Sequence, residues 1–122
     1  MRGHHLTADL RGCAATLPVM IDPQSLRAVC MACVQAVGLT PVGALFHPFP
    51  LPGGVTGMVL LAESHLAVHT WPERGAVTLD VYVCNFSRDH SEAAGRLMAS
   101  LIEAFAPQHA QRQWWLRGDA QA

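Results

Sequence analysis

Two stretches of the chain place apolar residues at the spacing of an α-helix. Asp22 and Pro23 begin the first as its N-cap and first helical residue, and Gly38 ends it. The second is predicted over Ser91–Phe105 and stops before Pro107. The apolar positions are Leu26, Val29, Cys30, Cys33, Val34 and Val37 in the first stretch, and Ala94, Leu97, Met98, Leu101, Ile102 and Phe105 in the second. Each predicted helix therefore has one apolar face to bury.

Most of the remaining sequence is typical of β-strands, because β-branched and aromatic residues are interrupted by Pro and Gly. The predicted strands are Thr40–Phe46, Val55–Ala62, His65–Trp71 and Ala76–Cys84, with outer strands at His5–Leu10 and Gln111–Leu116. Within Ala76–Cys84, one face is uniformly aliphatic and the other carries Asp80, Tyr82 and Cys84. We expect the aliphatic face to meet both helices and the other face to hold a site or a partner. The predicted fold is α+β: a two-layer sandwich, mainly antiparallel sheet with two helices on one face.

Length and composition indicate one folded domain. The 122 residues are 51% hydrophobic and 14% charged, which excludes disorder because enough apolar surface is available to offset chain entropy. A net charge of −1 without a basic cluster argues against nucleic-acid binding. Apolar runs such as Met58–Ala62 are far shorter than the roughly 20 residues of a membrane span, so we expect no membrane partner. No secretory signal is recognisable, and we expect a cytoplasmic protein.

Chemically active side chains concentrate between residues 58 and 84. They are Glu63, Ser64, His65, His69, Glu73, Asp80 and Cys84. Polarity of edge strands is one interpretation, and a metal site built on His65 and His69 with His47 or Cys84 is another. Because no His-Glu-x-x-His spacing supports the metal, we expect none, and a hydrolase would need a Gly-x-Ser-x-Gly turn that is missing. Cys30 and Cys33 lie within the helical pattern and are interpreted as core residues.

One segment resembles a known family. The residues Glu63-Ser-His-Leu-Ala-Val-His-Thr-Trp-Pro-Glu73, followed by Asp80-Val-Tyr-Val-Cys84, resemble the prokaryotic S-adenosylmethionine decarboxylases. Shorter matches are Gly3-His-His-Leu6, Phe46-His-Pro-Phe49 and Gly54-Val-Thr-Gly57, so the resemblance extends over most of the chain. It implies a single domain over residues 1–122 that cleaves itself into 1–63 and 64–122.

The resemblance implies the following chemistry. Ser64 attacks the preceding carbonyl, which converts the Glu63–Ser64 amide into an ester, and His69 then removes the Ser64 α-proton to drive β-elimination. Thr56 stands where the family usually has a Ser that supports processing. The new chain, 64–122, would begin with a pyruvoyl group, an internal electron sink that replaces an external cofactor. The substrate amine forms a Schiff base with this pyruvoyl carbonyl, carbon dioxide leaves, and Cys84 returns a proton to the substrate.

The substrate implied is S-adenosylmethionine, for spermidine biosynthesis, with Phe49 stacking on the adenine and Glu73 accepting hydrogen bonds from the ribose hydroxyls. Besides Thr56, three features depart from the family pattern. The segment Phe49–Gly54 is one residue longer, Arg74 follows Glu73 where Tyr is common, and Asn85 follows Cys84 where Gly is common. Alternatives left open are an ornithine or arginine decarboxylase of the same family, and an unprocessed, inactive homologue with a regulatory role.

Two further expectations concern assembly and strand geometry. The low charge and the exposed sheet face favour a homodimer of processed protomers, with Tyr82, Trp114 and Trp115 as candidates to bury at or near the interface. Ser64 and His69 are five residues apart, so on a regular strand they would point to opposite faces. We therefore expect either a break near Glu63–Ser64 or a bulge that re-aims His69.

Overall fold

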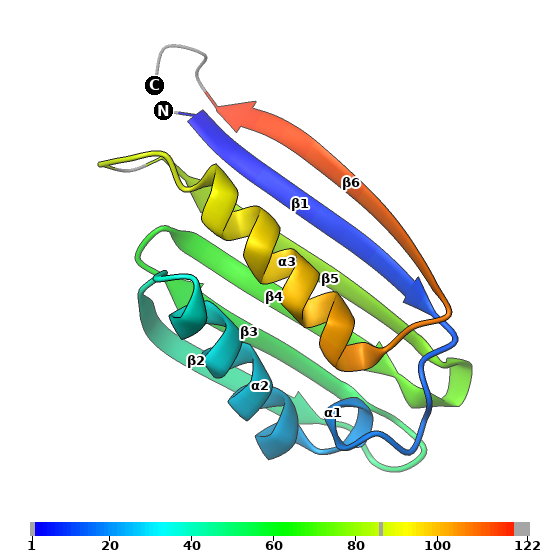
Figure 1. Ribbon diagram of the computed structural model, residues 1–122. Coiled ribbons are helices and arrows are strands. Elements are labelled where there is room, and N and C mark those ends of the chain that lie inside the picture. The colour runs from blue at the N-terminus through cyan, green and yellow to red at the C-terminus, as the bar shows by residue number, and fades with distance from the viewer. Residues whose placement is uncertain (1, 86, 119–122) are drawn as a thin grey trace.

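The computed structural model describes residues 2–85 and 87–118 as one antiparallel sheet with helices on one side (Figure 1). In chain order the elements are β1 (Arg2–Arg11), α1 (Pro18–Ile21), α2 (Pro23–Ala36), β2 (Pro41–Pro48), β3 (Val55–Leu61), β4 (Ser64–Trp71), a 3-10 helix (Pro72–Arg74), β5 (Ala76–Cys84), α3 (Ser91–Phe105) and β6 (His109–Gly118). The six strands lie in the order β2-β3-β4-β5-β1-β6, and every neighbouring pair is antiparallel. The predicted two-layer α+β sandwich is confirmed.

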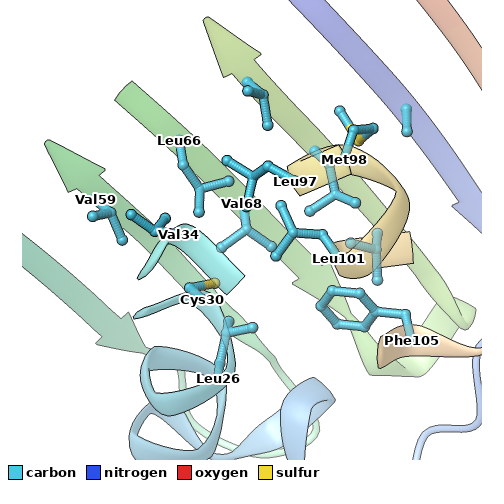
Figure 2. Packing of buried hydrophobic residues seen from close by; sticks show 14 of the residues in the cluster. Leu26, Cys30, Val34, Val59, Leu66, Val68, Leu97, Met98, Leu101 and Phe105 are labelled. Atoms are coloured by element: carbon cyan, nitrogen blue, oxygen red, sulfur yellow. The ribbon is translucent and has the colours of Figure 1, made fainter. Parts of the chain in front are cut away.

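The core lies between the sheet and helices α2 and α3 (Figure 2). The aliphatic residues of β5 are all buried, whereas the residues that alternate with them are half-buried on the other face. Leu26, Cys30 and Val34 of α2, and Leu97, Leu101 and Phe105 of α3, are completely buried against this sheet. Burial, with a smaller contribution from Cys33, raises the pKa of the Cys30 thiol to about 12. The thiol therefore stays protonated and packs as an apolar side chain, which confirms the core interpretation of Cys30.

Asp22 caps α2 as predicted. Its carboxylate accepts hydrogen bonds from the backbone N–H of Gln24 at 3.2 Å and from the Ser25 hydroxyl at 2.6 Å. The short helix α1 was not predicted, because four residues are too few to establish a helical repeat. Its Met20 is fully buried and helps to close the end of the core.

One strand position was predicted wrongly. The segment His5–Leu10 was expected at the outside of the sheet, but β1 lies between β5 and β6. The chain returns after α3 and adds β6 beyond β1, so the edges of the sheet are β2 and β6. Alternation along a strand shows which of its faces is buried and carries no information about which strands flank it.

The face of the sheet opposite the helices, here called the open face, carries Tyr82 and Trp115 but not Trp114. Trp114 pairs with Leu6 and lies toward α3, where a methyl group on Gly95 would sit 3.6 Å from the indole. Its Nε1–H also donates to Nδ1 of His4 at 3.1 Å. Trp114 is therefore not a candidate for an interface on the open face. No helix in the described part of the chain is long and apolar enough to cross a membrane.

Candidate active site

The Glu63–Ser64 bond lies where the tight turn between β3 and β4 ends. The Glu63 side chain is buried, and its Oε1 accepts a hydrogen bond of 3.1 Å from the backbone N–H of Thr40. The Glu63 carbonyl oxygen accepts a second one, of 2.9 Å, from the backbone N–H of Cys84. Both contacts hold Glu63 in place, and its carbonyl is polarised by a main-chain donor.

Ser64, the first residue of β4, has an irregular backbone conformation. Its φ is 154°, on the positive side that residues other than glycine rarely adopt. The sheet register pairs Ser64 with two buried residues, Leu61 and Val83, yet its Oγ lies 3.3 Å from Nδ1 of His65. The backbone is therefore irregular at Ser64, the first residue of the strand, while the pairing register continues regularly from Ser64 to His69.

His65 belongs to a cluster of ionisable and aromatic side chains on the open face. Its ring lies 5.8 Å from that of Tyr82, which in turn contacts the His5 ring at 5.6 Å and the Arg117 guanidinium at 5.1 Å. Nε2 of His5 is 2.9 Å from Oδ1 of Asp80. Partial burial, together with His5 and Arg117, lowers the pKa of His65 against the opposing effect of Asp80. The His65 ring is therefore neutral at pH 7.

Cys84, at the end of β5, lies beside the Glu63–Ser64 bond. The residue before it, Val83, pairs directly with Ser64, and Cys84 itself pairs with Gly3 of β1. Its thiol is free and half-buried. The structure thus brings together three of the residues singled out from the sequence: Glu63, Ser64 and Cys84.

A second group of candidate residues surrounds a pocket of about 360 Å³ at the other end of β4. Thr56 and His69 pair across β3 and β4, and Thr56 Oγ1 lies 3.2 Å from His69 Nδ1. The pocket is lined by Phe49, Gly53, Gly54, Thr56, His69, Thr70, Trp71 and Glu73. It unites all four of the residues that the sequence had suggested for processing support and substrate binding: Thr56, His69, Phe49 and Glu73.

Trp71 is a lining residue that sequence reasoning missed. Its ring stacks on His69, with centroids 5.9 Å apart and planes inclined by 28°. The available signal was its place in the Trp-Pro-Glu stretch next to Glu73. His65 was likewise considered only as a metal ligand, although it directly follows Ser64.

The two groups are far apart within one chain. Ser64 is the first residue of β4 and His69 the sixth, so at about 3.3 Å per residue their separation along the strand is about 16 Å. The structure therefore does not bring His69 to Ser64 within a single protomer. Each protomer therefore contains two half-sites. The cleavage half-site consists of the scissile bond and Cys84. The pocket half-site consists of the pocket and the Thr56–His69 pair.

Comparison with known proteins gives a consistent result over both half-sites. The family model for S-adenosylmethionine decarboxylase matches residues 4–118. A protein from Hydrogenobaculum sp., named S-adenosylmethionine decarboxylase proenzyme, is 38% identical over 117 residues, which cover 95% of this chain and 81% of its own. One of the same name from Archaeoglobus fulgidus is 38% identical over 106 residues, 87% of this chain and 88% of its own. The crystal structure of the adenosylmethionine decarboxylase from Aquifex aeolicus matches with a TM-score of 0.85 and 35% identity, covering 97% of this chain and 92% of that chain.

Proposed function

Because the chain belongs to the S-adenosylmethionine decarboxylase family, we propose that it decarboxylates S-adenosylmethionine after cutting its own backbone between Glu63 and Ser64. The observation that carries the proposal is the 2.9 Å hydrogen bond from the Cys84 N–H to the Glu63 carbonyl, next to a Ser64 hydroxyl on an irregular backbone. The relatives named above are decarboxylases of this substrate, and nothing in the comparisons favours ornithine or arginine.

Self-cleavage begins at the Glu63 carbonyl. Attack by Ser64 Oγ develops negative charge on the carbonyl oxygen, and the Cys84 N–H is already aimed at that atom. The attack exchanges the Glu63–Ser64 amide for an ester. Removal of the Ser64 α-proton by His69 then expels the Glu63 carboxylate and separates 1–63 from 64–122. The dehydroalanine left at residue 64 reacts with water and loses ammonia, which leaves a pyruvoyl group. Thr56, hydrogen-bonded to Nδ1 of His69, holds that ring in position.

The surroundings of residue 64 fit a pyruvoyl group formed from Ser64, because the scissile carbonyl is held by a backbone donor and a free thiol lies nearby. The chemistry that such a group supplies is an electron sink for the carbon–carbon bond that breaks. Cys84 supplies the proton that replaces the lost carboxylate on the substrate α-carbon. No external cofactor is part of this proposal.

The pocket half-site fits a nucleoside. Phe49 and Trp71 offer aromatic faces to the adenine, and base–aromatic stacking is worth about 1–3 kcal/mol per base. Glu73 accepts hydrogen bonds from the ribose hydroxyls. Arg74 is exposed and is not among the residues that line the pocket, so solvent screens its charge from the substrate's sulfonium. The departure from the family pattern at this position therefore leaves S-adenosylmethionine as the substrate.

A homodimer of processed protomers completes the proposal. Because about 16 Å along the strand separates His69 from Ser64 within one chain, we assign the His69 that acts on Ser64 to a second copy. The open face supports such a contact, because its residues Leu45, Met58 and Leu60 are 75%, 41% and 50% exposed and line an apolar hollow of about 370 Å³. In a two-fold dimer of this kind, each site combines the cleavage half-site of one protomer with the pocket half-site of the other.

The product supplies aminopropyl groups for spermidine biosynthesis. The proposed location is the cytoplasm, whose reducing conditions keep a partly exposed catalytic thiol such as Cys84 in its active form.

Intact-mass spectrometry of the purified protein tests the proposal. Two chains are expected, 1–63 and 64–122, and the second should be blocked to N-terminal sequencing. Carbon dioxide release is then measured in parallel from S-adenosylmethionine, ornithine, arginine and lysine, and only the first should react. A single chain after long incubation would contradict the self-cleaving enzyme and leave the inactive regulatory homologue. Release from ornithine or arginine alone would contradict the substrate.

A further inference from the structure

We propose that His65 is a further catalytic residue, the base that accepts the Ser64 hydroxyl proton when this hydroxyl attacks the Glu63 carbonyl. The inference rests on the proposed self-cleavage and concerns its first step, the exchange of the amide for an ester. His69 acts later, on the α-proton. The first step has a nucleophile in Ser64 and an oxyanion donor in the Cys84 N–H, and it also needs a group that takes the proton.

The geometry singles out His65. Its Nδ1 is 3.3 Å from Ser64 Oγ, a separation that can shorten as the hydroxyl becomes more acidic during attack. The contact depends on the φ of 154° at Ser64, because a regular strand would direct neighbouring side chains to opposite faces. His69, by contrast, is about 16 Å away along the strand and is engaged with Thr56.

The surroundings keep His65 in the form that a base needs. A neutral imidazole with its proton on Nε2 has a free lone pair on Nδ1, the atom that faces Ser64. The groups around the ring are Tyr82 and Asp80 on β5, His5 on β1 and Arg117 on β6. Asp80 is itself held by His5 at 2.9 Å, and burial with the nearby His5 and Arg117 lowers the pKa of His65.

The proton that leaves the Ser64 hydroxyl is fully accounted for by transfers between Ser64 and His65. As the bond between Ser64 Oγ and the Glu63 carbonyl carbon forms, the hydroxyl proton moves to Nδ1 of His65. The oxyanion that develops on the Glu63 oxygen accepts a hydrogen bond from the Cys84 N–H. When the carbon–nitrogen bond breaks, Nδ1 returns that proton to the departing Ser64 nitrogen. The products are an ester and a free amine, and His65 is again neutral. One ring can serve both atoms because Oγ and the nitrogen belong to the same residue.

The test follows self-cleavage of the full chain, freshly synthesised in a cell-free system, by intact mass over time. His65→Ala should slow cleavage by about a hundredfold or more, the usual contribution of a general base. His65→Asn should be equally slow, because an amide can hydrogen-bond to Ser64 without accepting its proton. Added imidazole should partly restore His65→Ala. His109→Ala, which removes an exposed histidine at the start of β6, is the control and should cleave like the wild type.

Two further readouts separate chemistry from structural damage. The wild-type cleavage rate should fall as the pH drops through the pKa of His65, and His65→Ala should lose this dependence. Hydroxylamine, which cuts esters, should leave stalled His65→Ala intact because no ester has formed. If His65→Ala does not fold, as judged by circular dichroism, His65→Asn decides alone.

The outcomes distinguish this inference from the proposed function. Absence of cleavage in the wild-type chain would overturn self-cleavage itself. Wild-type cleavage together with an equally fast His65→Asn would overturn the role of His65 alone. Cutting of stalled His65→Ala by hydroxylamine would do the same, because an ester would then have formed without this base.

Discussion

The backbone N–H of Cys84 donates a hydrogen bond of 2.9 Å to the carbonyl oxygen of Glu63. Cys84 therefore has two separable parts. Its main chain faces the bond that is proposed to break, and its thiol is available for the later reaction with substrate. Substitution of the side chain keeps the N–H, so mutation can remove the second function while retaining the first.

Cys84→Ala should cleave itself yet turn over poorly. The oxyanion donor is retained, whereas loss of the proton donor should lower turnover of S-adenosylmethionine by about a hundredfold or more. Intact mass measures cleavage, and carbon dioxide release per processed chain measures turnover. Unchanged turnover would rule out the thiol as the proton donor.

His69→Ala should stall after the ester has formed, because β-elimination needs the α-proton to be removed. Hydroxylamine should then cut the stalled chain between residues 63 and 64, which intact mass detects. Thr56→Ser is the matched control, since it keeps the hydroxyl that lies 3.2 Å from His69 Nδ1, and it should cleave normally. Wild-type cleavage in His69→Ala would refute the role of this ring.

Two inactive variants should complement each other if the site is shared. Ser64→Ala and His69→Ala are each expected to remain as a single chain when expressed alone. Co-expressed at equal levels, about half of the His69→Ala chains should pair with a Ser64→Ala chain, receive its His69 and cleave. Intact mass resolves the fragments of the two variants. If co-expression yields no cleavage beyond that of the separate variants, the two half-sites are not joined across a dimer.

Phe49→Ala should impair substrate binding without affecting self-cleavage, because Phe49 lines the pocket but is assigned no part in the chemistry of cleavage. Loss of about 1–3 kcal/mol of stacking corresponds to a decrease in kcat/KM of about 5- to 150-fold. Glu73→Gln should likewise lower kcat/KM through the weaker ribose contact. Arg74→Ala, exposed and outside the pocket lining, is the control and should leave kcat/KM unchanged. Equal losses in cleavage and in turnover would indicate a structural effect instead.

Leu60→Asp should dissociate the proposed dimer, because a carboxylate on the apolar part of the open face would lose its hydration on association. Sedimentation velocity at micromolar concentration should show a monomer, and self-cleavage should be lost with the dimer. Leu116→Asp is the matched control: Leu116 is 66% exposed, compared with 50% for Leu60, but lies on β6 at the far edge of the sheet. A wild-type monomer that cleaves and turns over fully would exclude the shared site.

The positions of two tryptophans show which structural details an alternating sequence pattern can predict and which it cannot. Trp114 and Trp115 are adjacent in an alternating strand, so one of them had to face the helices. The sequence alone did not indicate which one, because β6 is exposed along its whole length and has no apolar face to fix its orientation. The pairing of Leu6 with Trp114 decides the matter.

By itself, the sequence determined the two long helices, the strands, the two-layer fold and the family, because these depend on short-range periodicity and on residues that are contiguous in the chain. Only the tertiary structure decided that β1 lies inside the sheet, that the Cys84 N–H donates to the Glu63 carbonyl, and that the Ser64 hydroxyl contacts the His65 ring. Those relationships arise from pairing between distant strands and from one backbone angle, and neither leaves a periodic trace in the sequence. The distance between Ser64 and His69 belongs to the same class: the motif places them in one short segment, but an extended strand holds them about 16 Å apart.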